Sequence, residues 1–286
     1  MNGMSALTGA GASYGHLQEP PHLGNQYLED VTLRRYLQRV LSEADLREVE
    51  SDLERFGWEV ATTVKEYGAL AESEPPVLVK QDVWGNRIDE LKLSQGWLAQ
   101  KSVAAREGLV AIAYERRQGA LSRVVQASKL MLYGASSGLF NCPLAMTDGA
   151  ARLCELKRSA HPALADAFEH LTSRDPARFW TSGQWMTEKA GGSDVAAGTE
   201  TVAVPAEPGR AAAGSRFALH GYKWFTSAAD GEMAMTLGRE RDANGQPVPG
   251  NKGLSLFFVQ IRRDAGPTGR APRGFEVVRL KDKLGT

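Results

Sequence analysis

Cysteine is scarce in this 286-residue chain, which contains only Cys142 and Cys154. Two cysteines provide no disulfide framework, so we interpret both as reduced, partly buried thiols of a cytosolic type of compartment. Metal-binding motifs are missing as well. The sequence has no Cys-x-x-Cys or His-Glu-x-x-His, and its five histidines show no ligand spacing. A metal site is therefore not predicted.

The chain also lacks net charge and long apolar runs. Lys plus Arg and Asp plus Glu both number 34, so no basic excess marks a protein that binds phosphate backbones, although a local patch remains compatible with a neutral total. No apolar run approaches the roughly 20 residues that span a bilayer, so no membrane association is expected. Residues 1–25 have neither a transit-peptide nor a signal-peptide pattern and are predicted to be a disordered leader. Localisation defaults to the cytoplasm, with mitochondrion and peroxisome left open.

What the chain does contain is a helical first half. The longest predicted helix covers residues 43–73, with a capping pair at Ser42 and Asp45 and a stop at Pro75 and Pro76. Its apolar side chains recur at spacings of three and four and share one face: Leu46, Val49, Leu53, Phe56, Val60, Val64 and Tyr67. A turn is expected at Gly85-Asn86 within residues 81–90. Further helices are predicted over residues 94–117, 120–137, 147–157 and 162–172.

Beyond residue 173 the pattern changes to short strands. Gly, Thr and Val become common, and five segments are predicted to be strands: 199–205, 215–227, 232–239, 253–262 and 274–282. Helices followed by strands indicate an α+β fold, here an N-terminal all-α helical domain followed by an antiparallel β-barrel domain. We therefore expect a leader over residues 1–25, a helical domain over 26–178 and a β domain over 179–286.

Two motifs carry the chemistry. The Gly-Gly-Ser loop, WMTEKAGGSD at residues 185–194, follows a predicted strand, and its glycines let main-chain N–H groups approach an anion such as a pyrophosphate. The aromatic segment, GYKWFTS at residues 221–227, offers rings that can lie against a planar ligand and hydroxyls that can reach its edge. Taken singly, each motif has an ordinary alternative: a tight surface loop for the first and core packing for the second.

Together, the two motifs resemble the flavin-binding signature of the acyl-CoA dehydrogenases. The resemblance is strongest to the AidB-like branch and extends from about residue 25 to the end of the chain. Four blocks in the right order carry it: residues 186–195, 221–224, 279–285 and the Cys-Pro-Leu-Ala-Met-Thr run at 142–147. The resemblance implies an N-terminal helical domain, a middle β-barrel and, in family members, a C-terminal helical domain that we expect to be absent from this chain.

The resemblance also implies roles for single residues. Met186 and Thr187 are expected on the pyrimidine edge of the isoalloxazine of FAD, and Ser193 near the pyrophosphate or the substrate's phosphate region. Trp224 is expected against the ring, Thr226 near its reactive nitrogen, and Ser227 close to ligand. The predicted cofactor-binding set is Trp185, Met186, Thr187, Gly192, Ser193, Trp224, Phe225 and Thr226, and the predicted substrate-binding residues are Ser193 and Ser227.

The activity implied is FAD-dependent oxidation of an acyl-CoA thioester between Cα and Cβ. No residue of the chain is assigned as the catalytic base, because the family supplies it from or near the C-terminal domain. The chain is interpreted as a fragment, and whether it is active or inactive alone is left open. A homo-oligomer is implied for the full-length form, and nucleic-acid binding is implied by family analogy alone. The open alternative is a non-catalytic AidB-like protein that binds flavin, an acyl group or nucleic acid.

Overall fold

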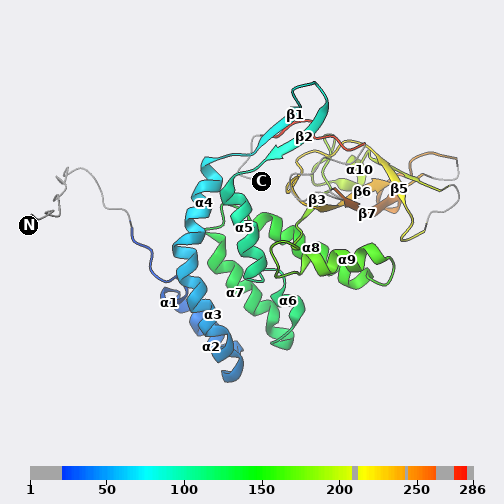
Figure 1. Cartoon of the computed structure of the whole chain (residues 1–286). Coiled ribbons are helices and arrows are strands. Elements are labelled where there is room, and N and C mark those ends of the chain that lie inside the picture. The colour runs from blue at the N-terminus through cyan, green and yellow to red at the C-terminus, as the bar shows by residue number, and fades with distance from the viewer. Residues whose placement is uncertain (1–20, 208–211, 242–243, 262–273, 282–286) are drawn as a thin grey trace, which may run out of the picture.

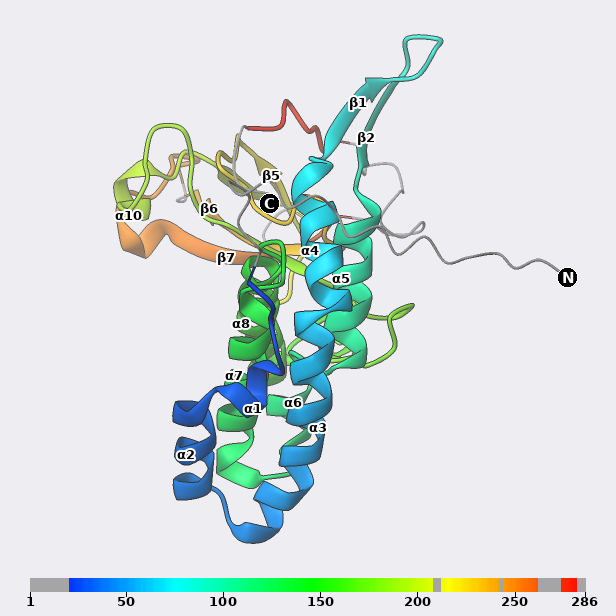
Figure 2. The ribbon, with the colours of Figure 1, turned by 90° about the vertical axis from the view of Figure 1, so that its left-hand side faces the viewer.

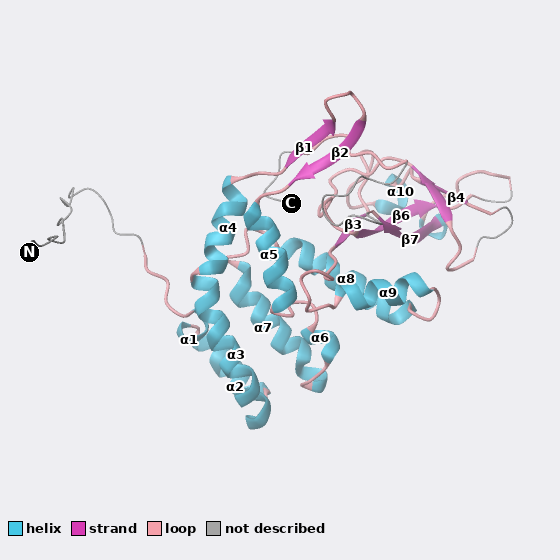
Figure 3. Ribbon diagram, in the orientation of Figure 1, coloured by secondary structure: helices cyan, strands magenta, loops and turns pink. Residues whose placement is uncertain are grey.

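The computed structural model describes residues 21–207, 212–241, 244–261 and 274–281. Helices gather in one part of the molecule and the larger sheet in the other, so the mixed α+β class predicted from the sequence is confirmed (Figures 1 and 3). The helices are α1 (Gln26–Glu29), α2 (Val31–Val40), α3 (Glu43–Ala61), α4 (Thr63–Ser73), α5 (Gln95–Arg106), α6 (Ile112–Glu115), α7 (Ser122–Gly134), α8 (Asn141–Lys157), α9 (Pro162–Leu171) and the single turn α10 (Val195–Gly198).

The long helix expected over residues 43–73 is divided at Thr62. The start agrees with the prediction, because Ser42 accepts a hydrogen bond from the amide of Asp45 and its hydroxyl lies 2.6 Å from the Asp45 carboxylate. At Thr62, however, the backbone leaves the helical region, and the hydroxyl donates to the carbonyl oxygen of Trp58, 2.8 Å away. A threonine hydroxyl that bonds back by one turn competes with the helical hydrogen bonds and bends the helix. The apolar stripe nevertheless continues into α4, where Val64 is fully buried.

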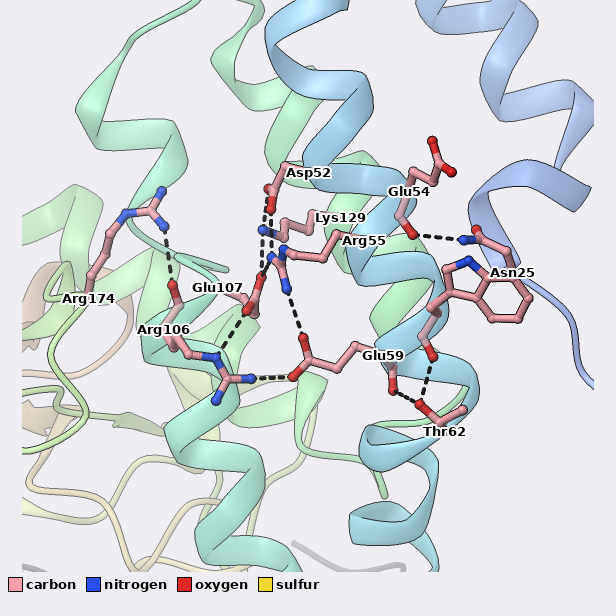
Figure 4. A network of polar contacts seen from close by, with 11 residues as sticks. Asn25, Asp52, Glu54, Arg55, Glu59, Thr62, Arg106, Glu107, Lys129 and Arg174 are labelled. Carbon is pink, nitrogen blue, oxygen red and sulfur yellow. Dashed lines mark hydrogen bonds and ion pairs between the residues drawn. The ribbon is translucent and has the colours of Figure 1, made fainter.

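A network of charged side chains lies inside the helical part (Figure 4). The ammonium group of Lys129, whose side chain is only 2% exposed, lies 2.5 Å from Asp52 and 2.9 Å from Glu107. Arg55 also pairs with both carboxylates. Burial alone would raise the pKa of Asp52 and Glu107, but hydrogen bonds and charge from Lys129 and Arg55 hold both pKa values below their usual range. The network therefore ties α3, α5 and α7 together through ionised groups.

A two-stranded hairpin interrupts the helical region. Strands β1 (Val77–Gln81) and β2 (Arg87–Lys92) pair antiparallel and project away from the helices (Figure 2). The turn predicted at Gly85-Asn86 is present. The Asp82 carboxylate accepts from the amides of Trp84 and Asn86, both at 2.9 Å, and Gly85 has the positive φ of 82° that glycine tolerates. The hairpin tip is therefore a defined turn, on which Val83 and Trp84 are 91% and 85% exposed.

The larger sheet has five strands and mixed pairing. They are β3 (Ser182–Trp185), β4 (Val202–Pro205), β5 (Phe217–His220), β6 (Met233–Arg239) and β7 (Leu254–Gln260). The central strand β6 runs parallel to β3 and, at one residue pair, to β4, and it runs antiparallel to all of β7. Strand β5 pairs antiparallel with β4. Two glycine-rich turns outside these ladders, η1 (Gly119–Leu121) and η2 (Asn251–Gly253), form 3-10 helices.

The predicted antiparallel barrel is not confirmed. Two of the pairings are parallel, and no strand pairing closes the sheet within the ranges described above. Strand propensity reports which residues favour extended backbone and does not report strand direction, which depends on long connections. Residues 274–281, predicted to be part of a strand, are extended without ladder pairing, and the remainder of that prediction, residue 282, lies outside the described residues. We call residues 274–281 the strap.

Candidate flavin and acyl-thioester site

The Gly-Gly-Ser loop is organised around Glu188. The Glu188 carboxylate is almost fully buried and accepts hydrogen bonds from the amide of Glu200 at 2.7 Å and from the Thr201 hydroxyl at 2.5 Å. It also lies 2.5 Å from the ammonium group of Lys223 in the aromatic segment. Burial alone would raise the pKa of Glu188, but these donors outweigh it and hold that pKa below its usual range. For Lys223 burial prevails, and its pKa is lowered despite the partner carboxylate.

The loop and the aromatic segment are also joined through their backbones. The amide of Trp224 donates to the carbonyl oxygen of Thr187 at 3.0 Å. The indole N–H of Trp185 donates to the carbonyl oxygen of Ser227 at 2.9 Å. Residues separated by about forty positions in the sequence are thus held together by several hydrogen bonds. The two motifs therefore converge in space.

The two central glycines of the loop have different surroundings. A Cβ on Gly191 would lie 2.5 Å from the Cα of Gly198, so the backbones at this point pack too closely for any side chain. A Cβ on Gly192 would meet nothing within 4 Å. Gly191 is therefore required by packing, whereas the space at Gly192 lies open to a ligand.

Phe225 has a backbone conformation that a bulky residue seldom adopts. Its φ is 59°, in the left-handed region, and its side chain is 53% exposed. Such a conformation costs about 1–3 kcal/mol and persists where surrounding contacts impose it, often at ligand-binding sites. Ala228, three residues later, also has a positive φ of 52°. The aromatic segment is therefore a strained loop and not a regular strand, and β5 ends before it at His220.

A cavity of about 1980 Å³ opens beside the aromatic segment. Its walls come from the end of the hairpin, from α5, from strands β5, β6 and β7, and from the strap. Trp97 of α5 lines it and donates its indole N–H to Asp230 at 2.8 Å, which links the helical part to the sheet. Small-molecule pockets commonly measure about 300–1000 Å³, so this cavity has room for more than one ligand.

The structure brings some predicted site residues together and leaves others aside. Of the predicted cofactor-binding set, Trp185, Trp224, Phe225 and Thr226 line the cavity. Met186 instead packs against the hydrophobic core, and Ser193 is exposed on the loop. The cavity walls do not include Met186, Thr187, Gly192, Ser193 or Ser227. The roles of all these residues stay predictions.

Several residues that shape the site were not singled out from the sequence. Glu188 and Lys223 stand inside the quoted motifs, and the available signal was the position of Lys223 between two aromatic residues. Arg239, at the end of β6, is buried and donates to the carbonyl oxygens of Thr199 at 2.8 Å and Gly250 at 2.9 Å, which fixes the loop that follows the Gly-Gly-Ser motif. No sequence spacing connects Arg239 with those loops.

Within the described residues, no group of three or more His, Cys, Asp or Glu side chains is arranged to hold a metal ion. None of the helices in that part of the chain is long and apolar enough to cross a bilayer. The cysteines are both free. Cys142 is exposed, whereas Cys154 is buried, and burial raises the pKa of its thiol to about 11.

The fold and the cleft define a two-part α+β protein in which helices precede a mixed sheet and an aromatic cavity lies where the two parts meet. Residues 17–175 match the family described as the adaptive response protein AidB N-terminal domain. The chain belongs to the acyl-CoA dehydrogenase family and to its AidB-like branch.

Relatives and solved structures agree on this family. Acyl-CoA dehydrogenase family member 11 of Caenorhabditis elegans is 43% identical over 95% of this chain and 43% of its own length. The putative acyl-CoA dehydrogenase AidB of Escherichia coli strain K12 is 31% identical over 77% of this chain and 38% of its own. The crystal structure of Caenorhabditis elegans ACDH-11 in complex with C11-CoA superposes with a TM-score of 0.86 at 41% identity, covering 95% of this chain and 44% of that one. The chain thus spans about two fifths of the length of these relatives.

Proposed function

We propose that the whole protein is an FAD-dependent oxidoreductase that oxidises acyl-CoA thioesters between Cα and Cβ, and that this chain supplies the flavin-facing wall of the site. The observation that carries the proposal is the convergence of the Gly-Gly-Ser loop and the aromatic segment beside one large cavity. The C11-CoA in the related ACDH-11 structure supports an acyl-CoA ligand class.

The residues present fit a flavin in shape and chemistry. Trp224 and Phe225 offer aromatic faces at the cavity, and Thr226 and Thr236 bring hydroxyl groups to the same wall. The Glu188–Lys223 pair and the strained backbone at Phe225 hold these groups in place before any ligand binds. Preorganised donors and dipoles of this kind stabilise charge that develops on a bound group. When bound, FAD would supply the acceptor for a hydride from the acyl chain, which protein side chains cannot provide.

The acyl thioester is expected to share the cavity. Its apolar lining includes Trp97, Met235 and Phe258. Such a lining suits an acyl chain, because each buried methylene group contributes roughly 0.8 kcal/mol to the free energy of binding. The base that removes the Cα proton is assigned to no residue of this chain. A homo-oligomeric state of the full-length form remains an implication of the family resemblance, as does any nucleic-acid binding.

The test is an anaerobic titration of the FAD-loaded protein with saturated acyl-CoA, performed on the 286-residue chain and on a version extended to the length of its relatives. Loss of the blue flavin absorbance band in the extended protein would support the dehydrogenase. Bound FAD that no acyl-CoA bleaches in either form would favour the non-catalytic binding protein. A protein that takes up no FAD in either form would rule out the flavoenzyme.

A further inference from the structure

The strap lines the cavity, and three of its side chains contact aromatic rings of the cavity wall. Phe275 stacks on Trp185 with ring centroids 5.7 Å apart and an interplanar angle of 23°. The guanidinium of Arg279 lies 5.1 Å from the ring centroid of Trp224. In an extended segment, residues two and four positions apart share one face. Phe275 and Arg279, four positions apart, thus both contact the aromatic wall.

Lys281 continues this pattern. Its ammonium group lies 4.6 Å from the ring centroid of Phe225. A cation above an aromatic face is attracted to the ring, and its own N–H donors remain available to other groups. Neither Arg279 nor Lys281 has an ion-pair partner among the residues that the structure describes. Within the described part of the chain, these two cavity cations have no carboxylate partner.

The opposite edge of the strap is held by the hairpin. Glu276 lies 3.0 Å from the Arg87 guanidinium. The amide of Val277 donates to the buried carboxylate of Asp89 at 3.1 Å, and Arg87 donates to the same carboxylate at 2.8 Å. The strap appears in red beside β1 and β2 in Figure 1. These contacts hold the strap against the hairpin and thereby position Arg279 and Lys281 at the cavity.

We propose that Arg279 and Lys281 bind the phosphate groups of the nucleotide-bearing ligand in this cavity, and that Arg87 is a positioning residue that holds them there through the strap. The inference rests on the proposed function for the identity of the ligand. Phosphate oxygens match the planar donor fork of arginine, and lysine adds a point charge. The phosphates belong either to the CoA part of the acyl thioester or to the pyrophosphate of FAD, and the two sources share this chemistry.

The experiment measures dissociation constants on the full 286-residue chain for two matched pairs of ligands. Acyl-CoA is compared with the corresponding S-acyl-pantetheine, which lacks phosphate, and FAD is compared with riboflavin. The variant Arg279→Gln/Lys281→Gln is compared with Arg47→Gln/Lys252→Gln, which removes the same charge from exposed positions outside the cavity. ADP serves as a probe that carries adenosine and phosphate groups but has neither an isoalloxazine ring nor an acyl-pantetheine arm.

The double variant is expected to bind ADP and one of the two phosphate-bearing ligands, acyl-CoA or FAD, roughly tenfold or more weakly than the wild type. The reason is that each charge-assisted hydrogen bond to phosphate is strong. Its phosphate-free counterpart should bind unchanged, and the control variant should bind every ligand as the wild type does. A loss confined to acyl-CoA assigns the cations to the thioester, and a loss confined to FAD assigns them to the cofactor. Arg87→Gln should weaken binding of the same phosphate-bearing ligand by a smaller factor. Its affinity for S-acyl-pantetheine or riboflavin should be preserved.

Unchanged affinity for ADP, acyl-CoA and FAD in the double variant would overturn the inference, and so would a wild-type chain that binds none of the three. An equal loss for the phosphate-free ligands would also overturn it, since that result would report a general disturbance of the cavity. The proposed function fails separately. If the protein binds ADP through Arg279 and Lys281 but takes up no flavin, the phosphate site is supported and the proposed flavoenzyme function is contradicted.

Discussion

The ammonium group of Lys223 lies 2.5 Å from the carboxylate of Glu188, and this buried pair joins the Gly-Gly-Ser loop to the aromatic segment that lines the cavity. The Thr201 hydroxyl and the amide of Glu200 donate further hydrogen bonds to the same carboxylate. The pair therefore acts as a brace: it sets the distance between the Gly-Gly-Ser loop and the aromatic segment.

Removing the charge of Glu188 should destabilise the fold. Glu188→Gln leaves Lys223 buried without its partner charge, and breaking a buried pair in this way costs about 3 kcal/mol. The control is Lys189→Gln in the same loop, which is exposed and should change the free energy of unfolding by less than about 0.5 kcal/mol. Urea unfolding measures both, and equal effects of the two substitutions would contradict the brace.

The two loop glycines should separate folding from binding. Gly191→Ala places a methyl group against the backbone of Gly198 and should lower the melting temperature clearly. Gly192→Ala meets no atom and has no positive φ to strain, so its melting temperature should stay close to that of the wild type. If a ligand approaches the backbone at Gly192, this variant should nevertheless bind FAD more weakly. Wild-type FAD affinity in Gly192→Ala would show that the ligand lies elsewhere.

The charge network of the helical part predicts that a buried and an exposed ion pair differ in how much they contribute to the free energy of unfolding. Lys129→Met removes the buried cation between Asp52 and Glu107 and should cost about 3 kcal/mol, because the buried Glu107 carboxylate then keeps only the half-exposed Arg55 and Arg106 as cationic partners. Arg47→Gln breaks an exposed helical pair 3.9 Å long and should cost at most about 0.5 kcal/mol. Chemical denaturation compares them, and a neutral effect of Lys129→Met would mean that the network contributes no net stability.

Acid should unfold the protein through these same groups. Asp52, Glu107 and Glu188 have pKa values below their usual range in the folded chain. Between those values and the ordinary carboxyl pKa of about 4, the unfolded chain binds more protons than the folded one. The stabilisation is therefore complete above about pH 5 and is lost as the pH falls through the folded-state pKa values. Denaturation midpoints from pH 7 to pH 3 should fall, and more gently in Glu188→Gln; a constant midpoint would refute this linkage.

The sequence predicted what local pattern determines and missed what distant contacts determine. The periodic apolar face of α3 and the turn at Gly85 follow from side-chain spacing and backbone freedom, and both are present. The break at Thr62 involves the hydrogen bond from its hydroxyl to the carbonyl oxygen of Trp58. The periodicity of apolar residues does not predict this bond. The parallel pairing of β3 with β6 depends on how the intervening chain crosses the sheet.

The site shows the same division. The two motifs are specific through their joint resemblance to a family signature and not singly, and the structure brings them together. The contact between the Arg279 guanidinium and the Trp224 ring joins residues more than fifty positions apart. It depends on where the hairpin holds the strap, so no spacing in the sequence predicts it. The assignment of Met186 to the flavin edge likewise rests on resemblance, and the structure has its side chain against the core.

The most direct test of the account is a titration of the chain with FAD, followed by flavin fluorescence anisotropy, for the wild type and for Trp224→Ala. The account predicts saturable binding of one FAD per chain in the wild type and a clearly weaker affinity in the variant, with both proteins melting at similar temperatures because Trp224 lies at the cavity wall. Equal affinity in the two proteins, or no saturable binding to the wild type, would contradict it.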